Sequence, residues 1–98
     1  MTTSYRPVEH IRRAAAARAT RAGEDLVLLH LERGHYFTLN ETGAAIWERI
    51  GDGAALGELR DALVEQFEVD PETAWRDVVE LVDELVAEGL VEIEEPGG

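Results

Sequence analysis

The sequence predicts an α+β fold in which a three-stranded antiparallel sheet is followed by three helices. Two apolar runs of strand length, Asp25 to Leu31 and His35 to Leu39, flank a tight Glu32-Arg33-Gly34 turn. After residue 40 the apolar residues recur at helical spacing almost to the end of the chain. Strands followed by helices are typical of α+β domains, and the last two predicted helices give the fold a winged helix-turn-helix-like outline.

The first 14 residues carry no periodic pattern, and Pro7 disfavours regular structure, so we expect a loose arm there. The alanines between His10 and Ala22 favour a helix, but the segment ends at Gly23 and precedes a strand pair. We therefore predict a strand over Ala15 to Thr20. The folded domain is expected over residues 15–93, with a disordered tail over 94–98.

The aliphatic run from Asp25 to Leu31 is predicted to be the central strand. The next strand, His35 to Leu39, alternates, so that His35, Phe37 and Leu39 share one face while Tyr36 and Thr38 share the other. This last strand is expected at an open sheet edge, where it could accept another chain.

The first predicted helix starts after Asn40 or Thr42, either of which can cap it, and stops at Gly51-Asp52-Gly53. It buries Ala44, Trp47 and Ile50. The second predicted helix buries one face, made of Leu56, Leu59, Leu63, Val64 and Phe67.

The third predicted helix has the clearest boundaries, with Asp70 as its cap, Pro71 at its first position and Gly89 beyond its end. It carries two apolar stripes. One consists of Ala74, Val78, Leu81 and Leu85, and the other of Trp75, Val79, Val82 and Val86. The second stripe needs a further surface, which could be the sheet, a dimer mate or a ligand, or both stripes could fill a wide core.

Composition excludes several functional classes. At 98 residues the chain supports one modest core, and without cysteine it has no disulfide, thiolate metal site or cysteine nucleophile. No apolar run approaches the ~18 residues of a membrane span, and Met1 to Pro7 lack the pattern of a secretion signal. We therefore expect a cytoplasmic protein without a membrane partner.

The formal net charge of −12 is unevenly distributed. Residues 1–50 hold six acidic side chains and seven arginines, whereas residues 51–98 hold fifteen acidic side chains and two arginines. Such a surface repels phosphate backbones, so nucleic acid is not expected as a partner. A solubilising surface is the simpler interpretation, and a site for a basic ligand is the alternative.

The residues needed for catalysis are missing. Ser4, in the expected arm, is the single serine, and His10, His30 and His35 form neither an HExxH motif nor an i, i+4 pair. His30 is predicted to be a strand residue rather than a metal ligand. We predict no enzyme activity, catalytic residues, metal or cofactor, and instead a peptide-binding module.

A helix-turn-helix regulator is the competing interpretation of the last two helices. In that case the leading turns of the third helix would present Glu72, Thr73, Arg76 and Asp77 to a DNA groove. Two carboxylates against one guanidinium is the wrong balance for that task.

The pattern of small and apolar residues resembles the PqqD-like family of peptide chaperones, also called RiPP recognition elements. The matching positions are Leu39-Asn40, Ala44-Ala45-Ile46, Gly51-Asp52-Gly53, Asp77-Val78 and Gly89-Leu90, within a likeness that covers about residues 15 to 93. The resemblance implies a three-stranded sheet and three helices. It also implies that the leader segment of a ribosomally made precursor peptide adds as a fourth strand beside the third strand, covered by the third helix.

Tyr36-Phe37, Trp47 and the long third helix look most like the stand-alone members of lasso-peptide pathways. The resemblance then implies two further partners, a leader peptidase and an ATP-dependent macrocyclase. The pyrroloquinoline-quinone branch, which works with a radical SAM enzyme, is the alternative, and a structural homo-oligomer is another.

The expected peptide-binding residues come from the third strand and the second stripe of the third helix. Arg76 could pair with a leader carboxylate and Asp83 with a basic leader residue. On the strand side we expected the Tyr36 and Thr38 side chains and the Phe37 and Leu39 backbone. The full set is Tyr36, Phe37, Thr38, Leu39, Trp75, Arg76, Val79, Val82, Asp83 and Val86.

Overall fold

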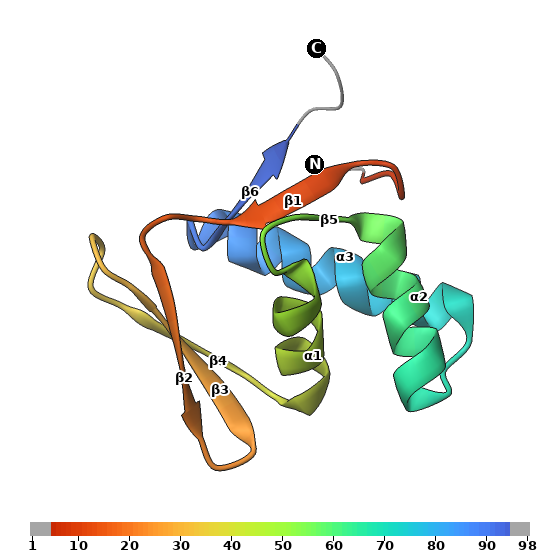
Figure 1. The fold of residues 1–98 in the computed structure, drawn as a ribbon, viewed down its shortest axis with the longest axis horizontal. Coiled ribbons are helices and arrows are strands. Elements are labelled where there is room, and N and C mark those ends of the chain that lie inside the picture. The colour runs from red at the N-terminus through yellow and green to blue at the C-terminus, as the bar shows by residue number, and fades with distance from the viewer. Residues whose placement is uncertain (1–4, 95–98) are drawn as a thin grey trace.

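The computed structural model describes residues 5–94, which fold into two small sheets and three helices (Figure 1). The predicted tail over 94–98 lies outside the described residues except for Glu94, which ends a strand. The elements in order are β1 (His10–Arg13), β2 (Ala17–Ala22), β3 (Asp25–His30), β4 (Tyr36–Leu39), α1 (Glu41–Ile50), β5 (Ala54–Ala55), α2 (Leu56–Phe67), α3 (Pro71–Ala87) and β6 (Val91–Glu94).

The predicted three-stranded antiparallel sheet is confirmed, with strand order β2-β3-β4. Its register runs from Ala17 opposite His30 to Ala22 opposite Asp25. The predicted first strand, Ala15 to Thr20, was therefore placed two residues too early. The reason is the tight hairpin turn at Gly23, whose φ of 68° closes it and pairs the residues directly on either side.

The alternation predicted for the third strand is also confirmed. Leu39 is 2% exposed and Phe37 packs against the core, whereas Tyr36, at 70% exposed, and Thr38 lie on the outer face. On β3, the side chains of Leu26, Leu28 and His30 are buried on the same core-facing side. The sheet thus has one face against the helices and one face open.

The expectation of a loose arm over residues 1–14 is wrong for the residues that the structure describes. Residues His10–Arg13 form β1, the central strand of a second sheet with order β5-β1-β6, and Ile11 is 0% exposed. Ahead of it, the Gly57 N–H donates to the Pro7 carbonyl (2.9 Å). Both partner strands are distant in the sequence, so no local pattern announces this pairing. The described part of the arm, residues 5–14, is therefore part of the fold.

Helix α1 follows β4 almost without a loop because its cap comes from the strand's end. The Gly43 N–H donates to Asn40 Oδ1 (2.9 Å), which settles the predicted choice of cap in favour of Asn40. Gly43 also packs tightly, since a Cβ there would lie 3.2 Å from the Leu39 Cβ. The buried stripe is the predicted one with Ile46 added.

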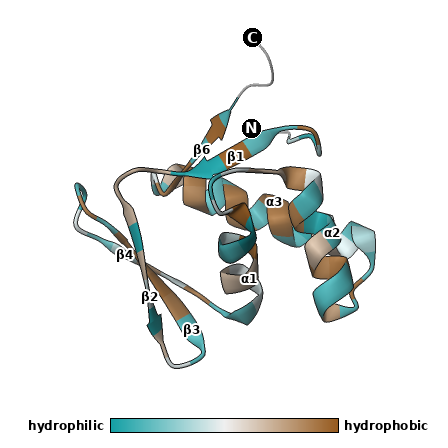
Figure 2. Ribbon diagram, in the orientation of Figure 1, coloured by the Kyte–Doolittle hydropathy of each residue, from teal (hydrophilic) through white to brown (hydrophobic). Residues whose placement is uncertain are grey.

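Helix α3 begins and ends where predicted. The Thr73 N–H donates to Asp70 Oδ1 (2.9 Å), and the helix runs for 17 residues before Gly89 turns the chain with a φ of 72°. Its fully buried residues come from both predicted stripes, namely Ala74, Val78, Val82 and Leu85. Apolar residues recur along α3 and β3, two of the elements that enclose the core (Figure 2). None of the helices in the described part of the chain is long and apolar enough to span a bilayer.

Candidate functional site

Strand β4 lies at an edge of its sheet. Among residues 5–94 it pairs only with β3, in the register Leu26 opposite Leu39 to Leu29 opposite Tyr36. An unpaired strand edge presents backbone N–H and C=O groups that can bind another extended chain. This edge is the first component of the candidate site.

The hydrogen-bond pattern identifies which backbone groups point outward. The His30 N–H donates to the His35 carbonyl (3.1 Å), so the backbone of His35 faces the strand that contains His30. In an antiparallel ladder bonded and non-bonded pairs alternate, so Phe37 and Leu39 also bond to β3. The backbone groups of Tyr36 and Thr38 therefore point away from β3. This corrects the expectation that Phe37 and Leu39 offer their backbones.

The other edge of the sheet, on β2, differs from the edge on β4. There the Arg18 guanidinium donates to the carbonyl oxygens of Ala15 and Ala17 (2.9 Å each). A charged side chain folded over a strand edge hinders pairing with a further strand. Of the two edges, β4 is thus the one left available.

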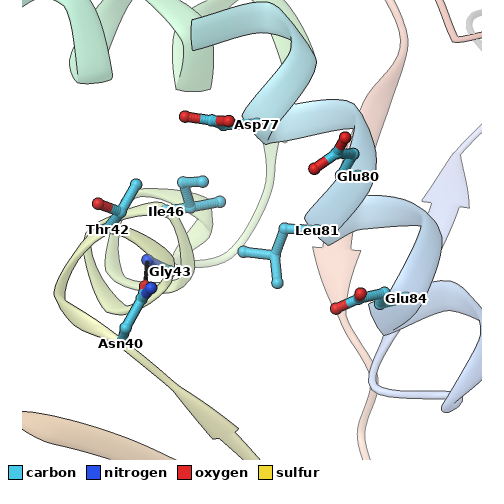
Figure 3. A pocket seen from close by; sticks show the side chains of 8 residues that line it. All are labelled: Asn40, Thr42, Gly43, Ile46, Asp77, Glu80, Leu81 and Glu84. Atoms are coloured by element: carbon cyan, nitrogen blue, oxygen red, sulfur yellow. Dashed lines mark hydrogen bonds between the residues drawn. The ribbon is translucent and has the colours of Figure 1, made fainter. Parts of the chain in front are cut away.

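A groove of about 270 Å³ opens beside the end of β4, between α1 and α3 (Figure 3). In Figure 3 the Leu81 side chain extends from α3 toward Gly43 and Ile46 on α1. The lining residues are Asn40 at the end of β4, Thr42, Gly43 and Ile46 on α1, and Asp77, Glu80, Leu81 and Glu84 on α3.

Two contacts join the turn that precedes β4 to the C-terminal end of α3. His35 Nε2 lies 2.7 Å from Glu88 Oε2, and Arg33 Nη1 donates to the Ala87 carbonyl (3.4 Å). The buried His30, confirmed as a strand residue, shapes the turn between them, because its Nδ1 accepts from the Arg33 N–H (3.1 Å). Strand β4 and the C-terminal half of α3 therefore lie alongside each other, with the groove at one end.

All four predicted strand residues lie on β4, the edge strand. Tyr36 and Thr38 flank the free edge on the outer face, and Phe37 and Leu39 flank it on the core face. Any strand added at the edge would place alternate side chains beside these two pairs.

The six predicted α3 residues are not among those that line the groove. Val82 is 0% exposed in the core, and the Tyr5 hydroxyl donates to Asp83 Oδ1 (3.1 Å). Trp75 lines a separate hollow with Tyr5, Pro7 and Arg60. Three residues remain, of which Arg76 is exposed, Val79 is half-buried and Val86 is 37% exposed.

Sequence reasoning missed the groove side of α3, which is formed by Asp77, Glu80, Leu81 and Glu84. Their i, i+3, i+4, i+7 spacing does place them on one helix face. Which face of α3 lines the groove depends on where the N-terminal arm packs. The sequence did not reveal that the arm is structured, and its Tyr5 lies on the side of Trp75 and Asp83. Residues 5–94 contain no cluster of three or more side chains suited to a metal ion.

The family model of coenzyme PQQ synthesis protein D (PqqD) matches residues 25–91 of the chain. This range contains β4, α1 and all of α3. No curated protein matches the chain.

Three solved structures are similar. TbiB1 in complex with the TbiA(beta) leader peptide is 30% identical, with a TM-score of 0.73, over 83% of this chain and 94% of its own. A lasso peptide synthetase B1 complexed with the leader peptide is 24% identical, with a TM-score of 0.70, over 84% and 96%. The PqqD truncation of PqqCD from Methylobacterium extorquens, a stand-alone RiPP recognition element, is 17% identical, with a TM-score of 0.77, over 92% and 96%.

Proposed function

Because the chain belongs to the PqqD family, whose RiPP recognition elements are non-catalytic peptide-binding domains, we propose that it binds a leader peptide by strand addition to β4. The leader is the N-terminal segment of a ribosomally synthesised precursor peptide. The observation that carries the proposal is the edge of β4, where Tyr36 and Thr38 direct unpaired backbone groups outward beside a groove.

Strand addition contributes modestly to the affinity for the leader, and this contribution depends little on the leader's sequence because it comes from backbone hydrogen bonds. Each new backbone hydrogen bond contributes roughly 0.5 to 1.5 kcal/mol net, and Tyr36 and Thr38 can form about four of them. Ordering a flexible leader offsets about 2 to 5 kcal/mol of that gain. Side-chain contacts therefore decide the affinity, and the groove residues of α1 and α3 supply them.

We place the helix-side contacts at Leu81, Glu80 and Glu84, which line the groove. A leader strand beside β4 would turn every second side chain toward them. Tyr36 and Thr38 contact the alternate side chains on the outer face. Trp75, which lines a hollow with Tyr5 and Pro7, and Asp83, which accepts from the Tyr5 hydroxyl, face the chain's own arm instead.

The lasso-peptide pathway is the proposed setting. TbiB1, at 30% identity over 83% of this chain, was solved with a leader peptide, and the second structure is named as a lasso peptide synthetase component. In that setting the protein hands the bound precursor to a leader peptidase and an ATP-dependent macrocyclase. The match to the PqqD family model favours the second candidate, a peptide chaperone of pyrroloquinoline-quinone synthesis working with a radical SAM enzyme.

A titration with a synthetic leader tests the proposal. The peptide is the leader of a short precursor sought among the genes that neighbour this protein's gene, and the amide resonances of the labelled protein are followed. Saturable shifts are expected at residues 36–42 and 77–84, with residues 5–9 and Trp75 as internal controls. Shifts confined to the controls, or no binding, would contradict the proposal.

The same gene neighbourhood separates the two pathways. A papain-like or transglutaminase-like protease gene next to an asparagine-synthetase-like gene is expected for a lasso pathway. A radical SAM gene in their place would favour the quinone pathway.

A further inference from the structure

The α3 wall of the groove is acidic, and no residue described in the structure places a cation opposite it. Asp77, Glu80 and Glu84 line the groove, and its five other lining residues are uncharged. None of the three carboxylates forms an ion pair within residues 5–94, not even with Arg76, which lies one turn before Glu80. The groove therefore presents three carboxylates to whatever occupies it.

The spacing of two of these carboxylates fits an added strand. Glu80 and Glu84 are one turn apart, about 6 Å along the helix at a rise of 1.5 Å per residue. Helix-facing side chains of an extended strand recur every second residue, about 6.6 to 6.8 Å apart. Two consecutive helix-facing side chains can thus each lie near one carboxylate.

Leu81 completes the fit to long basic side chains. It lies in the groove between the levels of Glu80 and Glu84 and extends toward α1 (Figure 3). Lysine and arginine pack their aliphatic stems on apolar surface while their charged ends reach outward. An apolar side chain flanked by carboxylates suits lysine and arginine better than it suits purely aliphatic side chains.

We infer that the leader segment bound by this protein is cationic, with lysine or arginine at helix-facing positions two residues apart. The inference rests on the proposed function and adds the chemical class of the ligand. The positive end of α1 also lies at the groove, but Glu41 in its first turn offsets it. Acidic or phosphorylated leaders are disfavoured by the same wall.

The test compares two triple variants that change the net charge equally. Asp77→Asn, Glu80→Gln and Glu84→Gln neutralise the groove. Glu58→Gln, Asp61→Asn and Glu65→Gln, around a separate hollow on α2, are the matched control. The probes are the synthetic leader of the neighbouring precursor gene and the same peptide with its lysines and arginines replaced by glutamine.

The groove triple is expected to bind the leader about tenfold more weakly at low salt, and the control triple within about twofold of the unmodified protein. Raising the salt to roughly 0.3 M should shrink the difference, because exposed charges are screened. The glutamine-substituted leader should bind both triples equally. Circular dichroism verifies that each variant is folded.

Equal loss in the two triples, or tight binding of the glutamine-substituted leader, would overturn the inference while leaving leader recognition intact. Failure of the unmodified protein to bind any part of the leader would overturn the proposed function, and the inference with it.

Discussion

The rest of the chain covers one long side of α3 and leaves the other side open. On one side, the N-terminal arm covers the helix through Tyr5, which donates to Asp83, and Arg60 lies 6.0 Å from the centre of the Trp75 ring. On the other side, Leu81 and its neighbouring carboxylates line an open groove beside β4. The chain satisfies one side internally and leaves the other available, so an apolar helix face does not by itself identify a binding site.

The first prediction separates the core contacts of α3 from its groove contacts by the same substitution placed one turn apart. Leu85 is 0% exposed, so Leu85→Ala should lower the free energy of unfolding by about 2 to 5 kcal/mol. Leu81 is half-buried, so Leu81→Ala should lower the free energy of unfolding by less than about 1 kcal/mol. The same substitution should weaken leader binding about fivefold. Denaturant unfolding and leader titration measure the two effects. Equal stability losses, or unchanged binding by Leu81→Ala, would contradict the assignment of Leu81 to the groove.

The second prediction compares the two sheet edges. Thr38→Pro removes an outward N–H without breaking a bond to β3, and should weaken leader binding tenfold or more, about 1 to 3 kcal/mol. Ala19→Pro is the matched control on β2. The Leu31 N–H donates to the Ala16 carbonyl (2.9 Å), and because bonded and non-bonded pairs alternate along the ladder, the Ala19 N–H points away from β3. Ala19→Pro should bind as the unmodified protein does. An equal loss of leader binding in the two variants would argue against β4 as the edge to which the leader adds.

The third prediction concerns the arm, and its effect is the smallest. Burial, followed by the hydrogen bond to Asp83, raises the pKa of Tyr5 to about 12 from 10.0, so the folded state favours the neutral phenol. Its contribution to stability is complete below pH ~10 and is lost as the pH rises from about 10 to about 12. Tyr5→Phe should cost at most about 1 kcal/mol and remove this alkaline dependence, while leaving leader binding unchanged.

Unfolding experiments at pH values between about 9 and 12 check this dependence. Unchanged pH dependence in Tyr5→Phe would show that the arm contact contributes nothing measurable. Weakened leader binding at neutral pH would show instead that the arm side of α3 belongs to the site.

Local patterns predicted most of the fold. The Asn40 and Asp70 caps, the Gly23 and Gly89 turns and the alternation along β4 each depend on residues close in sequence, and each lies where expected or within two residues. The second sheet could not be predicted, because β1 contains a single buried apolar residue, Ile11, and pairs with strands more than 40 residues away.

The strand side of the candidate site could be predicted from the sequence and the helix side could not, for the same reason. Its β4 residues follow from an alternation visible in the sequence. The α3 wall depends on which side of a helix with two apolar stripes the arm covers, and that is a long-range contact. Leu81 was therefore assigned to the buried stripe and Trp75 to the binding groove, whereas in the structure Leu81 lines the groove and Trp75 lines a separate hollow beside Tyr5.

Residue-resolved hydrogen exchange of the backbone amides, with and without the leader, tests strand addition most directly. In the free protein, Phe37 and Leu39 should exchange slowly and Tyr36 and Thr38 quickly. Saturation with leader should slow Tyr36 and Thr38 to the rates of their neighbours. Saturable binding that leaves the exchange of Tyr36 and Thr38 unchanged would contradict the account.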